Sequence, residues 1–501
     1  MKNTQWNATA VSSETHPNCY PEQPPFLNCR DTSMGVFSKK SHPRLTRLGA
    51  LQWLEKRSNF EQQPIGQNHK TAFTLARMRT LLRAIGNPQK QFPAAHLAGT
   101  KGKGSTAAML AAMVQSAGYR VGCYLSPHVN RIEERITVAG KEISTPDLLT
   151  AFHTVIPAVE KLDEIASQKK TIGPTWFEVL TAVAFTHFKQ AQIDLAVIET
   201  GLGGRLDATN LCNPIVSLIT NISLDHTDIL GDTICAIAKE KAGIIRRSIP
   251  VVSTAVHPDA SRVIVDKARA QRTKILLLNR DFAINQVTNT KPRSSRQPAL
   301  HSFEIQAPLG SRGTVYKTAM EGIHQAENAA SAIMATKVLS EQGFKIDEQA
   351  IATGLRKARL PARIEWVSDS PPIILDAAHN VASMESLVQT LVGRSGLPKK
   401  RVLIFAASAD KELGAMLSAS KTYFTDIVLT RYATNPRAAT ITRLRKAAGE
   451  GGWQDPHVAA SPTEAVAVGK RLAGRSGLLC IAGSFFLASE VRPALGAIID
   501  S

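Results

Sequence analysis

The sequence predicts an α/β protein with two domains, each built around a mostly parallel sheet. Short apolar runs typical of buried strands alternate with helical segments along most of the chain. The 501 residues are also too many for one ordinary hydrophobic core. No apolar run approaches the roughly 20 residues that span a bilayer, so we expect a soluble protein without a membrane partner.

The larger domain is expected over residues 46–358, after an extension over 1–45 that we expect to be disordered. In chain order, strands are expected over residues 94–98, 121–125, 195–199, 215–221 and 250–253. Helices are expected over 51–57, 72–85, 106–117, 176–188, 233–242, 326–342 and 348–357, and the 106–117 helix ends at Gly118. The 274–317 segment predicts a small antiparallel excursion or long loops.

A second, smaller α/β domain is expected over residues 359–501. The segment Leu360-Pro361-Ala362-Arg363 is typical of a linker. Beyond it, buried strands interleaved with helices are expected over residues 373–376, 402–406, 426–430 and 478–481.

Composition restricts the class of partner and the compartment. The net charge of +19 comes from basic residues spread along the chain, and aromatic residues are only 5%. This pattern favours an anionic small-molecule substrate over a nucleic acid. The six cysteines are scattered without CxxC spacing, which predicts a reducing, cytoplasmic location. The first 45 residues lack an apolar segment, so a secretory signal is not expected; translation could also begin at Met34.

A glycine-rich loop, Gly99-Thr100-Lys101-Gly102-Lys103-Gly104-Ser105-Thr106, lies between a predicted strand and a predicted helix. Backbone N–H groups and a helix N-terminus in this setting can bind phosphate. Lys103 would reach the β- and γ-phosphates, and Ser105 or Thr106 would offer hydroxyl groups to phosphate or Mg²⁺. The loop departs from the common G-x-x-x-x-G-K-[ST] pattern, because Gly104 intervenes before Ser105. The alternative is a flexible turn.

Three further polar residues follow predicted strands or helices of the same domain. Glu199 closes the 195–199 strand and precedes a glycine-rich loop, where a carboxylate could bind Mg²⁺ beside a nucleotide. His226 follows the next strand, and Lys241 lies 15 residues later (241 − 226 = 15), near the end of a predicted helix. Taken alone, Glu199 is as well explained as a solvated charge or helix cap, His226 as structural and Lys241 as solvated.

Taken together, these segments resemble folylpolyglutamate/dihydrofolate synthase, a family of the Mur ligase group. The segments that carry the resemblance run in the family's order from about residue 48 onward: Gly99 to Ser105, Ser126-Pro127-His128, Glu199 to Asn210, Asp225-His226, Glu240 to Ile244, His324 to Ala330, Leu360 to Glu365, Asp376 to Asn380, and Ala482-Gly483-Ser484. The resemblance implies a Mur-ligase-type phosphate-loop domain with a mostly parallel sheet, followed by a smaller Rossmann-like domain.

The resemblance also implies the ligands and the residues that bind them. ATP would be bound by Thr100, Gly102, Lys103, Gly104, Ser105, Thr106, Asn328, Arg363 and Asp376. Magnesium, expected as two ions, would be held by Ser126, Glu199 and His226. Lys241 matches a lysine that is carbamylated in relatives. The expected catalytic residues are therefore Lys103, Glu199, His226 and Lys241.

For the folate or pteroate substrate, the resemblance implies contacts from Trp176, Phe177, Glu178, Arg205, Leu206 and Asp207. Aromatic faces suit a flat heterocycle, although Trp176 and Phe177 are equally well explained as core residues at a helix start. Three departures from the family pattern concern Lys101, where Asn is usual, Ala362, where Gly is usual, and the 73–78 stretch, which lacks the usual Gly and Glu.

The expected reaction is ATP-dependent ligation of L-glutamate to a folate-type carboxylate through an acyl phosphate. The chain is expected to act as a monomer on dihydropteroate, on tetrahydrofolate tails, or on both. The alternatives are another Mur-type ligase acting on a cell-wall precursor and a non-catalytic nucleotide-binding module. The Gly104 insertion and the 203–210 block favour the folate branch over other Mur ligases, and the presence of Glu199, His226 and Lys241 favours activity.

Overall fold

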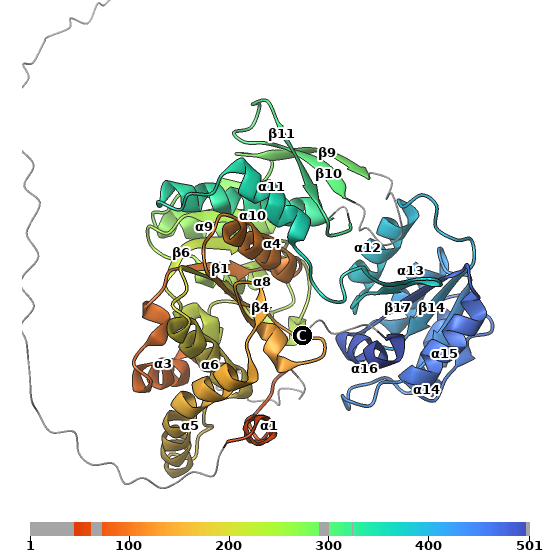
Figure 1. Ribbon diagram of the computed structural model, residues 1–501, viewed down its shortest axis with the longest axis horizontal. Helices are drawn as coiled ribbons and strands as arrows, with labels where there is room; N and C mark the ends of the chain where they lie inside the picture. The colour runs from red at the N-terminus through yellow and green to blue at the C-terminus, as the bar shows by residue number, and fades with distance from the viewer. Residues whose placement is uncertain (1–44, 62–72, 290–299, 323, 497–501) are drawn as a thin grey trace, which may run out of the picture. The chain divides into compact units, whose positions relative to one another are not determined.

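The computed structural model describes residues 45–61, 73–289, 300–322 and 324–496. The extension predicted over residues 1–45 lies outside the described residues, apart from its last residue. The contacts of the chain group everything from Leu45 onward into one unit (Figure 1).

The first sheet has eight strands in the order β4-β3-β2-β5-β1-β6-β7-β8. The pairs from β2 to β8 in this order are parallel, and β3 and β4 add antiparallel pairs at one edge. The strands are β1 Ala94–Ala98, β2 Val121–Tyr124, β3 Ile136–Val138, β4 Lys141–Glu142, β5 Leu195–Glu199, β6 Pro214–Ile219, β7 Val251–Ser253 and β8 Ile275–Leu277.

The central strand β1 lies between β5 and β6. Leu97 pairs with Glu199 of β5, and Ala98 pairs with Ile219 of β6. Every residue of β1 and β5 is buried, as expected for parallel strands covered on both faces. The carboxyl ends of the three strands therefore meet at one edge, which is where ligands bind in open α/β sheets.

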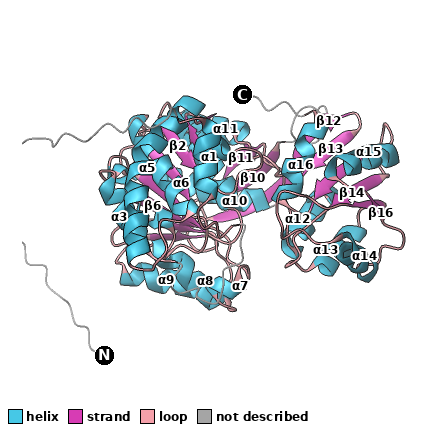
Figure 2. Cartoon of the chain, turned by 90° about the horizontal axis from the view of Figure 1, so that it is seen from below, coloured by secondary structure: helices cyan, strands magenta, loops and turns pink. Residues whose placement is uncertain are grey.

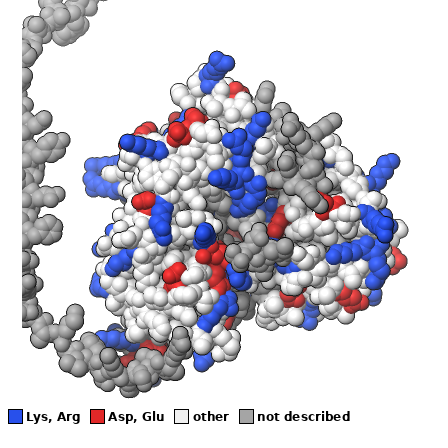
Figure 3. Space-filling view, in the orientation of Figure 1, with Lys and Arg blue, Asp and Glu red and all other residues white. Residues whose placement is uncertain are grey.

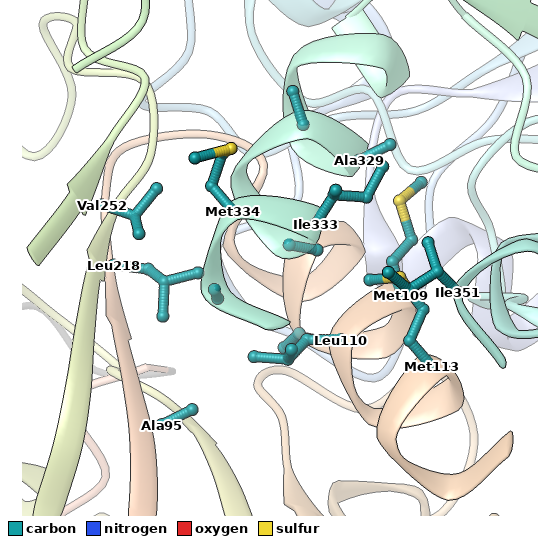
Figure 4. Close-up of a cluster of buried hydrophobic side chains, with 14 of the residues drawn as sticks. Ala95, Met109, Leu110, Met113, Leu218, Val252, Ala329, Ile333, Met334 and Ile351 are labelled. Carbon is teal, nitrogen blue, oxygen red and sulfur yellow. The ribbon is translucent and has the colours of Figure 1, made fainter. Parts of the chain in front are cut away.

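Helices cover both faces of this sheet (Figure 2). One face packs against α4 Lys103–Ser116, α10 His324–Glu341 and α11 Glu348–Lys357. Figure 4 shows Met109 and Met113 of α4 beside Ile351, with Ile333 of α10 close by. The other face packs against α1 Arg47–Glu55, α3 Leu75–Ala84, α5 Thr145–Gln168 and α6 Trp176–Gln190. A further apolar cluster includes residues of β6 and β7 and of the helices α8 Ile234–Lys241 and α9 Pro258–Ala270.

An antiparallel sheet follows, with strands β9 Ala283–Asn289, β10 His301–Gln306 and β11 Thr314–Thr318 in the order β11-β10-β9. It joins the apolar core on the α10 and α11 side through Phe303, Ile305 and Tyr316. The antiparallel excursion expected over 274–317 is confirmed, although its first strand, β8, belongs to the large parallel sheet.

The last sheet has six strands in the order β12-β13-β17-β14-β15-β16, parallel except for the β12 edge. Its strands are β12 Glu365–Asp369, β13 Pro372–Leu375, β14 Arg401–Phe405, β15 Asp426–Leu429, β16 His457–Val458 and β17 Leu478–Ala482. Its helices are α12 Val381–Val392, α13 Leu413–Lys421, α14 Ile441–Glu450, α15 Pro462–Ala473 and α16 Phe485–Leu495. The predicted α/β class is confirmed, and the boundary between residues 358 and 359 stays a prediction.

The main differences from the sequence prediction concern helices. The helix after the glycine-rich loop begins at Lys103 rather than Thr106, so the loop's own Lys and Ser belong to its first turn. The helices α5 and α9 were not predicted from the pattern. Each has a side-chain cap followed by a proline in its first turn: Ser144 caps α5, which contains Pro146, and His257 caps α9, which begins at Pro258. These are helix start signals that the sequence does contain.

Gly354 of α11 offers a test of the packing that supports the phosphate-loop helix. A Cβ at this position would lie 2.4 Å from the backbone of Met113 in α4. We expect Gly354→Ala to lower the free energy of unfolding by about 1–3 kcal/mol, because the two helices must separate. Gly449→Ala in α14, where a Cβ meets nothing within 4 Å, should instead be neutral or stabilising. Urea unfolding measures both; equal effects would contradict the packing argument.

Candidate active site

The glycine-rich loop after β1 is held against the chain that follows β6. The Thr100 N–H donates to the Asn221 carbonyl at 2.7 Å, and the Thr100 hydroxyl donates to the Ser223 carbonyl at 3.1 Å. Gly102 caps α4 with a φ of 86°, a left-handed conformation that glycine adopts without strain. The loop therefore places the N-terminus of α4 at the carboxyl edge of the sheet, as the phosphate-binding prediction requires.

Asn328 lies directly against this loop. A Cβ on Gly102 would fall 2.1 Å from the Asn328 side-chain oxygen, so only glycine allows the approach. Asn328 is buried in the first turns of α10, and its amide donates to Gln325 Oε1 at 2.9 Å. The structure thus brings together two predicted ATP-binding segments that are separated by more than 200 residues in sequence, the glycine-rich loop and Asn328.

Two lysines meet at the first residue of the loop. The amino groups of Lys103 and Lys241 donate to the Gly99 carbonyl at 3.0 and 2.9 Å. Lys103 Nζ also lies 3.9 Å from Glu199 Oε1. Three of the four predicted catalytic residues, Lys103, Glu199 and Lys241, are therefore gathered around the phosphate loop.

Glu199 is almost fully buried at the end of β5, with 4% of its surface exposed. Its Oε2 accepts a hydrogen bond from the Ser126 N–H at 3.0 Å, which places the predicted metal-binding Ser126 and Glu199 side by side. Burial raises the pKa of the Glu199 carboxyl, while Lys103 and the Ser126 N–H oppose the rise. A bound cation would favour the ionised carboxylate in the same way.

Lys241 is also buried, near the end of α8. Burial lowers the pKa of its amino group to about 7, and the nearby charge of Lys103 acts in the same direction. A large fraction of this amine is therefore uncharged near neutral pH. An uncharged amine is nucleophilic, which is what formation of a carbamate from CO₂ requires.

His226 is the least enclosed of the predicted catalytic residues, since about half of its side chain (52%) is exposed. It has a φ of 50° and precedes the short helix α7 Thr227–Leu230. Its ring Nε2 lies 4.0 Å from Asp225 Oδ1, outside hydrogen-bond distance. Burial lowers the pKa of His226, opposed by Asp225 and reinforced by Lys411, Lys103 and Lys241. His226 therefore lies close enough to Lys103 and Lys241 for their charges to affect its pKa.

The donors around Glu199 suit Mg²⁺ better than a metal that needs an all-protein cage. Among the described residues no group of three or more His, Cys, Asp or Glu could hold a metal ion. Mg²⁺ does not need one, because it is usually held by one or two carboxylates together with substrate phosphates and water. The buried hydroxyls of Thr106, in the phosphate loop, and Thr200, which follows Glu199 in sequence, have no hydrogen-bond partner within the described part of the chain.

Arg363 and Asp376 lie near each other at the start of the C-terminal sheet. Asp376 accepts hydrogen bonds from the Ile364 and Ala378 N–H groups, both at 2.8 Å, so its carboxylate orders the linker itself. Burial raises the pKa of Asp376, and the Arg363 charge opposes the rise. The Arg363 guanidinium lies 5.0 Å from the Phe485 ring centroid. Asp376 therefore shapes the backbone next to Arg363.

The residues predicted to contact folate fall into two groups. Trp176 is in the hydrophobic core, with its indole N–H donating to Glu55 at 3.0 Å, so the core interpretation describes its position. Glu178 caps its own helix and pairs with Arg77 at 3.1 Å. Phe177 lies against Gly201, where a Cβ would fall 2.6 Å from the ring. Substrate contact by these three residues stays a prediction.

The second group borders a small cavity of about 150 Å³ just beyond Glu199. The cavity is lined by Phe73, Leu202, Gly203, Arg205, Leu206, Ile229, Leu230 and Glu240. Arg205 pairs with Glu240 at 2.9 Å. Asp207 lies beneath this loop, because its carboxylate accepts the N–H groups of Leu202 at 2.9 Å and Thr209 at 3.0 Å.

Six cavity residues were not predicted as site residues: Phe73, Leu202, Gly203, Ile229, Leu230 and Glu240. Leu202, Gly203 and Glu240 lie in segments that carried the family resemblance. Phe73 begins the 73–78 stretch, which departs from the family pattern, and Ile229 gave no signal of its own, since an isolated apolar residue is more often part of the core.

Residues 97–336 match the Mur ligase middle domain, and residues 362–485 match the Mur ligase glutamate ligase domain. A dihydrofolate synthase/folylpolyglutamate synthase of Bacillus subtilis is 33% identical over 450 residues, which cover 89% of this chain and 98% of that protein. The chain belongs to the folylpolyglutamate/dihydrofolate synthase family of Mur ligases. The predicted resemblance is confirmed.

Solved structures of this family agree with the fold. A folylpolyglutamate synthase of Mycobacterium tuberculosis, complexed with ADP and AMPPCP, superposes with a TM-score of 0.78 at 29% identity and covers 90% of this chain and 98% of that one. A folylpolyglutamate synthase complex with AMPPCP and folate gives a TM-score of 0.74 at 31% identity and covers 90% of this chain and 100% of that one. Like the family, the chain is an ATP-dependent ligase.

The lowered pKa of Lys241 predicts a pH dependence of stability. Between about pH 7 and 10.5 the unfolded chain binds a proton at this site that the folded chain does not, so stability rises with pH. In CO₂-free buffer, the wild type should gain several kcal/mol relative to Lys241→Met from pH 7 to pH 10, at about 1.4 kcal/mol for each unit of pKa difference. Denaturant unfolding at several pH values measures this gain. Lys239 is exposed on the same helix, so Lys239→Met is the control, and the wild type should show no such gain relative to this variant.

Proposed function

We propose that the chain joins L-glutamate to a folate-type carboxylate at the edge where β1 and β5 end. The observation that carries the proposal is the convergence of the phosphate loop, the Glu199 carboxylate and the cavity at one edge of the sheet. The cavity is lined in part by the loop that follows Glu199 at the end of β5, from Leu202 to Leu206.

ATP is proposed to bind with its phosphates on the loop from Thr100 to Thr106 and at the N-terminus of α4. The Asn328 contact with Gly102 supports a role for Asn328 beside the loop. Arg363 and Asp376 are proposed to contact the same nucleotide from the C-terminal sheet. The charge of Arg363 acts both on Lys101 of the phosphate loop and on the buried Asp376, which supports a single site.

Glu199, Ser126 and His226 are proposed to hold magnesium, expected as two ions. When bound, Mg²⁺ would neutralise the charge of the γ-phosphoryl group during its transfer. Glu199 and Ser126 are already adjacent.

The proposed reaction has two steps. First, the substrate carboxylate attacks the γ-phosphorus of ATP, which releases ADP and gives an acyl phosphate. The amino group of L-glutamate then attacks the acyl carbon, loses a proton and expels phosphate, which leaves an amide. The protein mainly positions the reactants and stabilises developing charge. Lys103 is placed to do both, since its amino group lies between the Gly99 carbonyl and Glu199.

Lys241 is proposed to be carbamylated. The reaction adds CO₂ to the neutral amine and releases one proton, which turns a neutral group into an anion. Its pKa of about 7 supplies the neutral amine, and Lys103 supplies a nearby cation that stabilises the product. The amino group contacts the Gly99 carbonyl, so the new carboxylate would lie next to the phosphate loop.

The acceptor is proposed to be both dihydropteroate and a tetrahydrofolyl tail. The cavity combines apolar side chains with the Arg205–Glu240 ion pair, which suits a flat heterocycle bearing polar edges. The similarity to the Bacillus subtilis enzyme, whose name gives both activities, supports the bifunctional proposal. Phe177, Arg205, Leu206 and Asp207 are proposed to shape or contact this substrate, and Trp176 and Glu178 to support it from beneath.

The chain is further proposed to act as a monomer in the cytoplasm on small-molecule substrates alone. The four cysteines within the described residues, Cys123, Cys212, Cys235 and Cys480, are free, which supports a reducing compartment. None of the helices that the structure describes is long and apolar enough to cross a membrane. Lys and Arg side chains spread over the face shown in Figure 3 agree with the net charge of +19 and suit anionic substrates.

The proposed reaction can be tested by ADP release. With ATP, Mg²⁺ and L-glutamate, we expect release to depend on added dihydropteroate or tetrahydrofolate, because the carboxylate of either can accept the γ-phosphoryl group. A muropeptide precursor should give no release. If neither dihydropteroate nor tetrahydrofolate supports turnover, the folate proposal is wrong. If only one of them does, the enzyme is not bifunctional.

The carbamate on Lys241 can be tested by chemical rescue. We expect Lys241→Ala to lose at least about tenfold in kcat, because one charged contact near the phosphates is removed. Added acetate or formate should restore part of the rate, since a short carboxylate can occupy the vacated space. Lys239→Ala, on the exposed side of α8, is the control for the helix. Full activity of Lys241→Ala without added carboxylate would remove the carbamate from the mechanism.

A further inference from the structure

Lys101 makes a contact that neither the phosphate-loop pattern nor the proposed reaction explains. Its amino group donates a hydrogen bond to the side-chain oxygen of Asn380, the residue that caps α12. The two residues are 279 positions apart in sequence. The contact therefore joins the phosphate loop to the first helix of the C-terminal sheet.

Both ends of this contact are fixed. The carbonyl of Lys101 accepts a hydrogen bond from the Thr220 hydroxyl at 2.7 Å, and its backbone pairs with Asn221. The side-chain oxygen of Asn380 also accepts the N–H of Ser383 at 3.0 Å and its hydroxyl at 2.9 Å. A hydrogen bond between two anchored groups transmits position, because neither end can rotate freely to follow the other.

Asn380 belongs to the same short loop as Asp376. The loop is stiffened from within, since Asp376 accepts the Ala378 N–H at 2.8 Å and the His379 N–H donates to the Ser383 hydroxyl at 3.0 Å. A displacement of Asn380 would therefore carry Asp376 with it.

We propose that Lys101 is a positioning residue that, through Asn380, holds the loop bearing Asp376 against the phosphate loop and so completes the nucleotide site. The inference rests on the proposed function in one respect: it takes Asp376 to contact the nucleotide. It differs from a direct role in phosphate binding, in which Lys101 would act without Asn380.

The surroundings of Lys101 argue against the interpretation that it is a surface lysine without a specific role. Lys103, Arg363 and Lys411 all lie close enough to disfavour a further positive charge, and Asp225 alone among its charged neighbours favours it. Burial adds to this, and the pKa of Lys101 falls to about 8. A Lys ammonium has three donors, and Asn380 accepts one of them. A test must therefore separate the contact with Asn380 from a contact with phosphate.

A second contact keeps α12 in place when the first is removed. The hydroxyl of Ser386, further along α12, lies 2.8 Å from the His324 ring at the start of α10. Loss of the Lys101 contact would thus loosen the N-terminal end of α12 rather than detach the helix. Variants at position 101 should remain folded.

The test is a double-mutant cycle on nucleotide affinity. Lys101→Met and Asn380→Ala are made singly and together, and the binding of AMPPCP with Mg²⁺ is measured by calorimetry. Asn380→Ala also removes a helix cap, so its own loss can exceed that of Lys101→Met. The quantity tested is the loss caused by Lys101→Met in each background.

If Lys101 acts through Asn380, Lys101→Met should lower affinity about tenfold or more in the wild type, as for a hydrogen bond to a charged group, and less than about twofold in Asn380→Ala. The same loss in both backgrounds would overturn the proposal in favour of direct phosphate contact. No loss in either background would overturn it as well. Lys101→Arg, which keeps a donor, should retain more affinity than Lys101→Met.

Lys411→Met is the matched control, because it removes an equal charge from the same neighbourhood while its own ammonium pairs with Asp410 at 3.4 Å. Lys411→Met should have the same effect on affinity in the wild type and in Asn380→Ala. A difference between the two would mean that the cycle measures the loss of a positive charge rather than the Lys101–Asn380 contact. The binding cycle needs no acceptor substrate. Failure of ADP release with pteridines would therefore count against the proposed function and leave the cycle interpretable.

Discussion

The parallel pairing of β1 with β5 on one side and β6 on the other is the constraint on which the site depends. It sets the carboxyl ends of three strands side by side, so the loops after them have to share one edge. The phosphate loop follows β1, Glu199 ends β5, and the segment leading to Asp225 and His226 follows β6. Residues distant in sequence become neighbours because the sheet has this strand order and register.

Close backbone approach is the second requirement. Gly102 must lack a side chain because Asn328 lies where its Cβ would be. Gly204 is confined in a similar way, with the Glu240 and Lys241 carbonyls 3.0 Å from a Cβ built on it. The glycines let α10 and α8 approach the two glycine-rich loops closely, and polar contacts such as the Lys241 hydrogen bond to the Gly99 carbonyl then hold α8 in place.

The electrostatics of the site follow from burial of unlike charges around a few carbonyl and N–H groups. Lys103 and Lys241 share the Gly99 carbonyl, and Glu199 shares its surroundings with Lys103 and the Ser126 N–H. Burial pushes the lysine at 241 toward its neutral form and the carboxyl at 199 toward its protonated form. A bound Mg²⁺ would favour the ionised form of the Glu199 carboxylate, which is why the site fits a magnesium nucleotide.

The sequence by itself determined the α/β class, the strands β1, β2, β5, β6 and β7 of the large sheet, and the segments that form the candidate site. Apolar runs, glycines and family motifs are local signals, and local signals suffice for those features. Only the tertiary structure decided which residues touch. It placed Trp176 in the core, revealed Phe73 and Ile229 at the cavity, and carried Lys101 to Asn380. Such contacts depend on strand order and helix packing between distant segments, and no local pattern encodes them.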